Sequence, residues 1–161
     1  MQRLINLCAY LFSLMQIRLR AAVFIVEKNK LLVVHHNFSD SDYWLIPGGT
    51  LSPGEPIEVE AVGKVKIETG LDILIERFLF TREYFSGNSH FVEFYFLGSL
   101  SPPHQTPVVD SSVAPSVVEV KFLSFEELSS VKFFPLFIKE QLSTFIHSDF
   151  KDVEPYLGLK E

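Results

Sequence analysis

The segment from residue 49 to residue 71 constrains the fold of this chain more than any other part of the sequence. The Pro-Gly pair at 53–54 is typical of a turn, and Pro56 suits the first turn of a helix. Gly70 is placed where a helix would end, because glycine readily adopts the left-handed conformation of a helix C-terminus. We therefore predict a helix over residues 57–69.

At about 100° per residue, this predicted helix has two distinct faces. The apolar face should pack on a sheet and consists of Ala61, Val62 and Val65. The second face, within about a quarter turn, consists of Glu60, Lys64, Ile67 and Glu68. The charged side chains of the helix therefore gather on the side that the core does not use.

Short apolar runs on both sides of this helix predict a mixed α/β protein built in layers. The predicted strands form two hairpins and a later single strand: 18–27 with 31–36, 72–84 with 90–97, and 117–123. The proline-rich stretch 101–116 has no apolar period and predicts a loop. Two short sequences predict further helices: a capping box at 124–127, and Pro135 near the start of a last helix that ends at about His147.

Length, charge and cysteine content limit the class of protein. The 161 residues, 47% hydrophobic and 21% charged, suffice for one domain, which we assign to 18–161. A formal net charge of −6 argues against binding of long nucleic acids, which needs a basic surface. A small phosphorylated ligand needs only local positive charge. The single Cys8 excludes an internal disulfide and fits the reducing cytoplasm.

Residues 1–17 form an apolar extension ahead of this domain. The run from Leu4 to Met15 is too short for a stable membrane span, which takes about 20 residues, and no small-residue cleavage site follows it. Its leucines recur at helical spacing: Leu4, Leu7, Leu11 and Leu14. The spacing predicts a short amphipathic helix packed on the domain or on a partner. The alternatives are an upstream extension before a true start at Met15, membrane association, and export.

The spacing of glycines and acids in residues 49–71 resembles the Nudix box. Six of its nine defined positions match: Gly49, Glu55, Val65, Glu68, Gly70 and Leu71. The Pro-Gly pair at 47–48 also looks like the usual approach to this motif. The resemblance covers the chain from about residue 18 onward. It implies the Nudix fold, an α/β (α+β) architecture with a mixed β-sheet sandwiched between α-helices.

Three positions of the box depart from the family pattern. Gly63, Lys64 and Ile67 stand where the family has Arg, Glu and Glu. In the family, carboxylates on this helix hold Mg²⁺, which neutralises a diphosphate and lowers the pKa of the attacking water. Three glutamates carry about three negative charges at neutral pH. Here Lys64, Ile67 and Glu68 sum to about zero, so we expect Mg²⁺ binding to be weak or absent.

The resemblance assigns roles to the residues that remain. The carbonyl of Gly49 and the carboxylate of Glu68 are the expected metal ligands, and Glu68 is also the expected catalytic residue. Glu93, on the second hairpin, is the expected acidic ligand from outside the box. The alternatives are that Glu68 caps the helix or pairs with Lys64, and that Glu93 is an exposed strand position.

Aromatic and cationic side chains are the expected contacts to a ligand. The candidates to stack on a base or pair with a phosphate are Tyr43, Trp44, Arg82 and Tyr84. Lys64 is a candidate to meet a phosphate directly. A core position is the alternative for Trp44. The two histidines at 35–36 lack a neighbouring ligand at metal spacing, so we interpret them as surface or loop-supporting residues.

Two functions remain open. The first is a hydrolase of a nucleoside diphosphate linked to another group, weak or altered because of the three substitutions. The second is a catalytically inactive Nudix-fold module that binds a nucleotide-like ligand or a protein partner. The sixteen phenylalanines are most simply core residues, with a homodimer face as the alternative for some of them.

Overall fold

The protein is described by a computed structural model over residues 16–38 and 41–160, so the predicted N-terminal helix lies outside the described residues. The described helices are α2 (Ile57–Thr69), α3 (Phe125–Ser129) and α4 (Leu136–His147). The described strands are β1 (Gln16–Glu27), β2 (Lys30–Phe38), β3 (Ser41–Leu45), β4 (Gly48–Thr50), β5 (Ile73–Ser86), β6 (Ser89–Leu100), β7 (Val117–Leu123), β8 (Phe133–Phe134) and β9 (Tyr156–Leu159).

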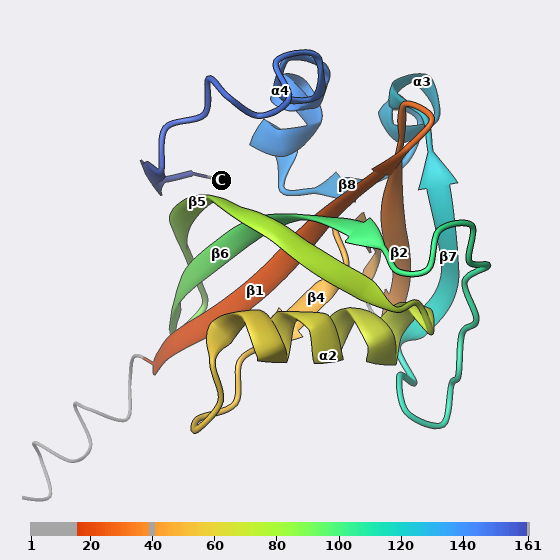
Figure 1. Ribbon diagram of the computed structural model, residues 1–161. Coiled ribbons are helices and arrows are strands. Elements are labelled where there is room, and N and C mark those ends of the chain that lie inside the picture. Colours follow the sequence, from red (N-terminus) through yellow and green to blue (C-terminus); the bar gives the residue numbers. More distant parts are fainter. Residues whose placement is uncertain (1–15, 39–40, 161) are drawn as a thin grey trace, which may run out of the picture.

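A mixed nine-stranded sheet forms the centre of the fold. Its strand order is β8-β3-β2-β1-β6-β5-β9, with β4 paired to β1 and β7 paired to β2. β1 runs parallel to β6 and antiparallel to β2 and β4. Helix α2 lies on one side of the sheet and α3 and α4 lie on the other (Figure 1). The predicted fold class, a mixed sheet between helices, is confirmed.

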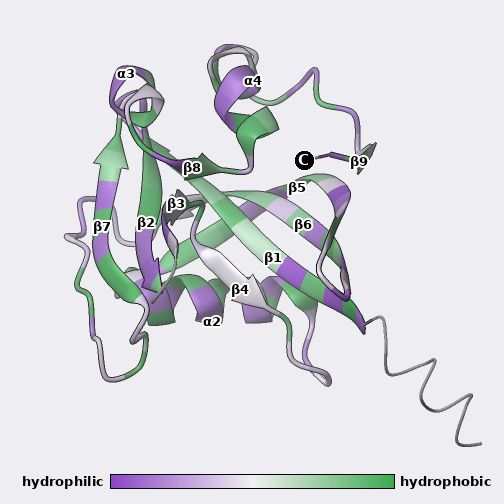
Figure 2. Ribbon diagram, turned by 180° about the vertical axis from the view of Figure 1, so that it is seen from behind, coloured by the Kyte–Doolittle hydropathy of each residue, from purple (hydrophilic) through white to green (hydrophobic). Residues whose placement is uncertain are grey.

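Strand β1 separates two hydrophobic cores because successive side chains of a strand point to opposite faces. Ala21 and Val23 pack in the core beneath α2, whereas Ala22 and Phe24 pack in the core beneath α4. Figure 2 shows β1 changing from mixed polar and apolar residues at its start to hydrophobic residues further along. The apolar second half of β1 is therefore buried on both faces. The first half contains Arg20, which contributes to the site described below.

Helix α2 begins and ends where the sequence predicts. Pro56 precedes it and Gly70 ends it in the left-handed conformation, with φ at 71°. A Cβ at Gly70 would lie 2.7 Å from the Val108 carbonyl oxygen, so the close approach of the 101–116 loop also requires glycine. Ala61 and Val65 are fully buried against the sheet, as the apolar face predicts.

The other predicted elements are confirmed: the four strands of the two hairpins are longer than predicted, and β7 has the predicted bounds. Lys28 and Asn29 alone turn the first hairpin, both with positive φ, and Gly87 and Asn88 turn the second. The 101–116 loop contains no helix or strand, and the capping box before α3 is formed by Ser124 with Glu127. β1 begins at Gln16, ahead of the expected domain start at residue 18. The short strands β3, β4, β8 and β9 were not predicted, because pieces of two to five residues are too short to show a clear period.

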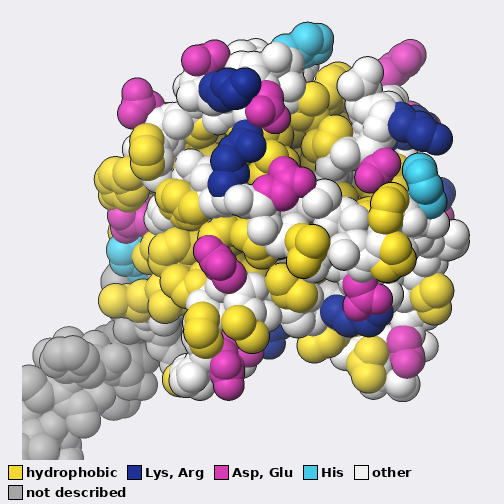
Figure 3. All heavy atoms as spheres, in the orientation of Figure 1, with side chains coloured by type: hydrophobic (Ala, Val, Ile, Leu, Met, Phe, Trp, Pro, Cys, Tyr) yellow, Lys and Arg dark blue, Asp and Glu magenta, His cyan; other side chains and the backbone are white. Residues whose placement is uncertain are grey.

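One face of the sheet beside the start of α2 stays partly open. A shallow groove of about 490 Å³ is bordered by Pro56, Ile57, Glu58, Phe78, Phe94 and Phe96. Figure 3 shows hydrophobic side chains gathered on this side of the molecule. Among the helices that the structure describes, none has the length and apolar character needed to cross a membrane.

Candidate functional site

The retained box glutamate, Glu68, is tied to the protein through both of its carboxylate oxygens. Oε2 accepts a hydrogen bond from the Gly48 backbone N–H at 2.9 Å. Oε1 lies 3.3 Å from Nε2 of His36, whose other ring nitrogen lies 3.1 Å from the Ser116 hydroxyl. Glu68 thus joins α2 to the start of β4 and to strand β2, and through His36 to the end of the 101–116 loop.

His36 is buried, with 6% of its surface exposed, so the interpretation of His36 as a surface residue is wrong. It lies at an irregularity where β2 shifts its register against β7, between His35 and His36. His36 has the same parity along β2 as Leu32, which packs in the core beneath α2, so its ring faces α2 from inside the sheet. The partners of His36 carry no local sequence signal, because they are 32 and 80 positions away in the chain.

Backbone geometry places two glycines against the box helix. Gly48 has φ at 154°, and a Cβ there would lie 2.1 Å from the Ala21 carbonyl oxygen, so only glycine allows β4 to pair with β1. A Cβ at Gly49 would lie 3.0 Å from Cδ of Lys64. The aliphatic stem of Lys64 therefore covers Gly49, which is the position expected to offer a carbonyl to a metal.

Lys64 is paired along its own helix. Its Nζ lies 3.5 Å from Oε2 of Glu60, four residues earlier, and Glu60 also accepts a hydrogen bond of 2.9 Å from the Ser52 backbone N–H. The hydrogen bond from Ser52, helped by the charge of Lys64, lowers the pKa of Glu60. The alternative pairing of Lys64 with Glu68 does not occur, since Glu68 is turned toward His36.

These residues do not form a donor set suited to Mg²⁺, which requires near-octahedral oxygen coordination. Glu68, the one carboxylate that the helix keeps at a position where the box has glutamate, is already paired with an imidazole and a backbone N–H. The ammonium of Lys64 lies on the same face of the helix. Ile67 offers no oxygen. Within residues 16–38 and 41–160, no three His, Cys, Asp or Glu side chains come together closely enough to hold a metal ion.

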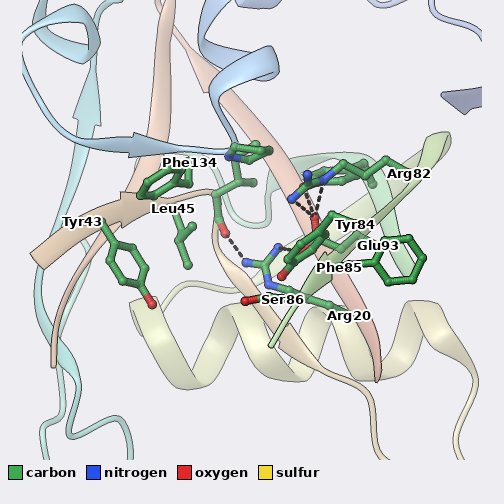
Figure 4. A pocket seen from close by; sticks show the side chains of 12 residues that line it. Arg20, Tyr43, Leu45, Arg82, Tyr84, Phe85, Ser86, Glu93 and Phe134 are labelled. Atoms are coloured by element: carbon green, nitrogen blue, oxygen red, sulfur yellow. Dashed lines mark hydrogen bonds and ion pairs between the residues drawn. The ribbon is translucent and has the colours of Figure 1, made fainter. Parts of the chain in front are cut away.

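A cavity of about 410 Å³, called here the central pocket, opens between strand β3 and the part of the sheet formed by β1, β6 and β5 (Figure 4). Its walls come from β1, β3, β5 and β6 and from the junction of β8 with α4. The residues that line it are Arg20, Tyr43, Leu45, Ile46, Arg82, Tyr84, Phe85, Ser86, Glu93, Tyr95, Phe134 and Pro135. Aromatic rings and two guanidinium groups therefore face one small space.

A buried charge network forms one wall of the central pocket. Glu93 is 3% exposed, and its Oε2 lies 2.7 Å from both Nε and Nη2 of Arg82. The Glu93 Oε1 lies 3.6 Å from Nη1 of Arg20, and the Tyr95 hydroxyl donates a hydrogen bond to Glu93. Arg20 also donates to the Ile46 carbonyl at 2.8 Å. Two cations and one anion leave the pocket with a net positive charge.

The same network shifts the ionisation of the pocket tyrosines. Burial, together with the negative charge of Glu93, raises the pKa of Tyr84 to about 12 and raises that of Tyr95 further. Burial also raises the pKa of Tyr43. All three phenols are therefore neutral at physiological pH and can donate or accept hydrogen bonds inside the pocket.

The structure distributes the predicted site residues between two places. Gly49, Lys64 and Glu68 lie together on the α2 side, and Arg82, Tyr84 and Glu93 lie together in the central pocket. Trp44 is not part of either group: it is 8% exposed, packs in the core beneath α4 and stacks on His35. Because side chains alternate along β3, its neighbours Tyr43 and Leu45 line the pocket instead.

One further prediction, about Glu93, has an outcome, and two lining residues were not predicted. The alternative of Glu93 as an exposed strand position is wrong, because Glu93 is buried. Two arginines compensate the charge of its carboxylate and so make this burial possible. Arg20 and Phe134 line the pocket but were not predicted as ligand residues. The alternation of β1 could have indicated Arg20, since it has the same parity as the core residues Ala22 and Phe24 and so points to the same face.

Comparisons with known proteins identify the family and the fold. A family model described as the NUDIX domain matches residues 16–145, and the chain belongs to the Nudix family. Nudix hydrolase 5 of Arabidopsis thaliana is 41% identical to this chain over 59 residues, which cover 34% of this chain and 20% of that protein. The match therefore spans about a fifth of the length of that relative.

Solved structures show the same fold at low identity. The MutT protein from Methanosarcina mazei Go1 superposes with a TM-score of 0.69 at 15% identity, covering 84% of this chain and 96% of that one. A Nudix hydrolase from Nitrosomonas europaea has a TM-score of 0.69 at 20% identity, covering 87% and 93%. At these identities the likeness concerns the fold alone.

Proposed function

We propose that this Nudix-family protein binds a small phosphorylated, nucleotide-like ligand in the central pocket without needing Mg²⁺. In this proposal, hydrolysis of a nucleoside diphosphate linked to another group is at most slow. The observation that carries the proposal is the engagement of Glu68, whose two carboxylate oxygens bind the Gly48 N–H and face the His36 ring. The glutamate that would hold a catalytic cation instead braces the fold.

The central pocket supports the binding half of the proposal. Tyr43 and Phe134 supply aromatic rings for a base, whereas the Tyr84 ring is already covered by Phe91 and by the Arg82 guanidinium. Arg20 offers a guanidinium that suits phosphate oxygens. A cavity of about 410 Å³ falls within the size range of small-molecule sites. Nudix proteins generally bind small nucleotide-like substrates, so a ligand of this class agrees with the family as well as with the chemistry of the pocket.

The position of Lys64 supports metal-free binding of phosphate. Ala21, next to Arg20 on β1, pairs with Gly49 on β4, and the stem of Lys64 lies on Gly49. Arg20 and Lys64 therefore lie on opposite faces of the pair formed by β1 and β4, with Lys64 on the face toward α2. A phosphate group that extends from the pocket past the pair formed by β1 and β4 would meet fixed positive charge. The usual Nudix box would supply a divalent cation there.

Calorimetric titration with ADP-ribose in the presence of EDTA tests the binding half. We expect binding without metal and a loss of at least about tenfold in affinity for Arg20→Met, because a charge-assisted hydrogen bond to phosphate is removed. Arg18→Met is the matched control. Arg18 lies two residues earlier on the same face of β1 and outside the pocket lining, so this variant should bind like the wild type. Equal affinity for all three proteins would contradict the proposal.

A turnover assay tests the catalytic half. Product release from ADP-ribose, dinucleotides and nucleoside triphosphates is measured with and without Mg²⁺, for the wild type and for the variant Gly63→Arg, Lys64→Glu, Ile67→Glu. We expect the variant to gain Mg²⁺-dependent turnover, because it restores carboxylates at the box positions. Turnover at ordinary enzymatic rates by the wild type, with no gain in the variant, would show that the altered box does not limit catalysis.

A further inference from the structure

We propose that β9, near the C-terminal end of the chain, positions the charge network of the central pocket, so that residues 156–160 belong functionally to the ligand site. This inference rests on the proposed function of the pocket. It starts from Arg82, whose guanidinium does not point freely into the pocket: its Nη1 donates a hydrogen bond of 2.7 Å to the Lys160 backbone carbonyl.

The backbone of β9 is held to β5 on both sides of Arg82. The Thr81 N–H donates to the Pro155 carbonyl at 2.8 Å, and the Lys160 N–H donates to the Glu83 carbonyl at 2.9 Å. β9 runs parallel to β5 and forms its edge partner, away from the rest of the sheet. These bonds clamp the segment next to Arg82 without using any side chain of the pocket.

An irregularity in this pairing directs the Lys160 carbonyl toward Arg82. Thr81 pairs with Tyr156 and Glu83 pairs with Leu159, so β9 contains one more residue than β5 over the same stretch. Gly158 lies in this stretch with φ at 65°, a left-handed conformation that glycine adopts without strain. The extra residue shifts the following backbone, which brings the Lys160 carbonyl within reach of the guanidinium.

The remaining donors of Arg82 hold Glu93. Its Nε and Nη2 both lie 2.7 Å from the Glu93 Oε2, and its guanidinium lies 4.3 Å from the Tyr84 ring centroid and 5.4 Å from that of Phe137. The Arg82 side chain is 6% exposed. Each of the three guanidinium nitrogens therefore has a partner within the protein, Nη1 in the Lys160 carbonyl and Nε and Nη2 in Glu93, and Arg82 acts as a positioning residue rather than as a contact to ligand phosphate.

This commitment determines how much positive charge Arg20 can offer. A buried carboxylate needs a partner, and Glu93 takes two close contacts from Arg82 and a longer one of 3.6 Å from Arg20. If β9 detaches and Arg82 moves, Glu93 must draw Arg20 closer. The guanidinium of Arg20 would then be neutralised by Glu93 instead of facing a ligand. β9 thus keeps Arg20 available.

The test compares Lys160→Pro, which removes the N–H that bonds to the Glu83 carbonyl, with Tyr156→Phe, which removes a side-chain hydrogen bond between the same strand and Glu83 but leaves the backbone bonds intact. Phenylglyoxal labelling of Arg82, read by mass spectrometry, reports on the clamp without any ligand. We expect labelling of Arg82 to be at least about fivefold faster in Lys160→Pro and unchanged in Tyr156→Phe, since only the first loses a backbone hydrogen bond. Unchanged labelling in folded Lys160→Pro would overturn the proposal.

Calorimetry with ADP-ribose on the same proteins adds the functional readout. We expect about tenfold weaker binding by Lys160→Pro and unchanged binding by Tyr156→Phe. Faster labelling of Arg82 with undiminished ADP-ribose affinity would overturn the link between β9 and the ligand site. If Arg82 is labelled faster in Lys160→Pro but the wild type itself binds no ADP-ribose, the proposed ligand is rejected and the clamp is established. Gly158→Val, which strains the left-handed position, serves as the second variant if Lys160→Pro does not fold.

Discussion

The carboxylate of Glu68 lies 3.3 Å from the imidazole of His36, so the last acidic residue of the Nudix box faces a ring from the centre of the sheet. Both side chains are largely buried, at 14% and 8% exposure. The pair connects α2 to β2, and through the Ser116 hydroxyl it reaches the 101–116 loop. A position that in the family pattern belongs to a metal cluster is thereby part of the internal bonding of this fold.

Replacing His36 is expected to destabilise the protein. His36→Ala leaves the Glu68 carboxylate and the Ser116 hydroxyl without their shared partner, and we expect the free energy of unfolding to fall by about 1–3 kcal/mol. Urea denaturation measures this change. Ser116→Ala, which removes only the outer hydrogen bond, should cost less than His36→Ala. A His36→Ala protein as stable as the wild type would show that the pair contributes nothing.

Two glycines of the box helix should respond to alanine in opposite ways. Gly63 lies on the exposed face of α2 and a Cβ there would meet no atom within 4 Å, so Gly63→Ala should stabilise the protein by about 0.5–1 kcal/mol. Gly70→Ala should destabilise it, because φ is 71° and the new Cβ would lie 2.7 Å from the Val108 carbonyl oxygen. Thermal unfolding of the two variants gives the signs, and a shared sign would contradict this account.

The Arg82–Glu93 pair should show strong coupling. Removing one partner of a buried pair costs about 3–5 kcal/mol, because it strands the other charge. We expect a loss of this size for Arg82→Met, and a smaller loss for the double variant Arg82→Met, Glu93→Gln. A double-mutant cycle from chemical denaturation measures the coupling. If the losses of the single variants simply add in the double variant, Arg82 and Glu93 are not coupled, and Arg20 alone compensates the charge of Glu93.

Stability should fall at high pH because of Tyr84. Its pKa is raised to about 12 in the folded protein, mainly by burial, against about 10 in an unfolded chain. The folded state therefore favours the neutral phenol, and this contribution is complete below about pH 10 and lost as pH rises toward about 12. In an absorbance titration of the phenolates, Tyr84→Phe should lack one of the groups that ionise at the highest pH in the wild type. Loss of an early-titrating group instead would place Tyr84 in an ordinary environment.

Local patterns in the sequence determined the helices and most of the strands. Pro56 and Gly70 set the ends of α2 through backbone preferences that need no tertiary partner, and the capping box of Ser124 with Glu127 acts within four consecutive residues. The hairpin at Lys28-Asn29 is local in the same sense. The family spacing of residues 49–71 then indicated the fold, which the family match and the arrangement of the sheet confirm.

The tertiary structure alone decided which chemistry these elements bring together. The partner of Glu68 is His36, and the partners of Arg82 are Glu93 and the Lys160 carbonyl, 11 and 78 positions away in the chain. Side-chain alternation allowed either Trp44 or Tyr43 to face a ligand, and the direction in which β3 packs put Tyr43 there. Contacts of this kind depend on strand order and register, which short-range patterns do not encode, because each is set by burial of the whole sheet between its two layers of helices.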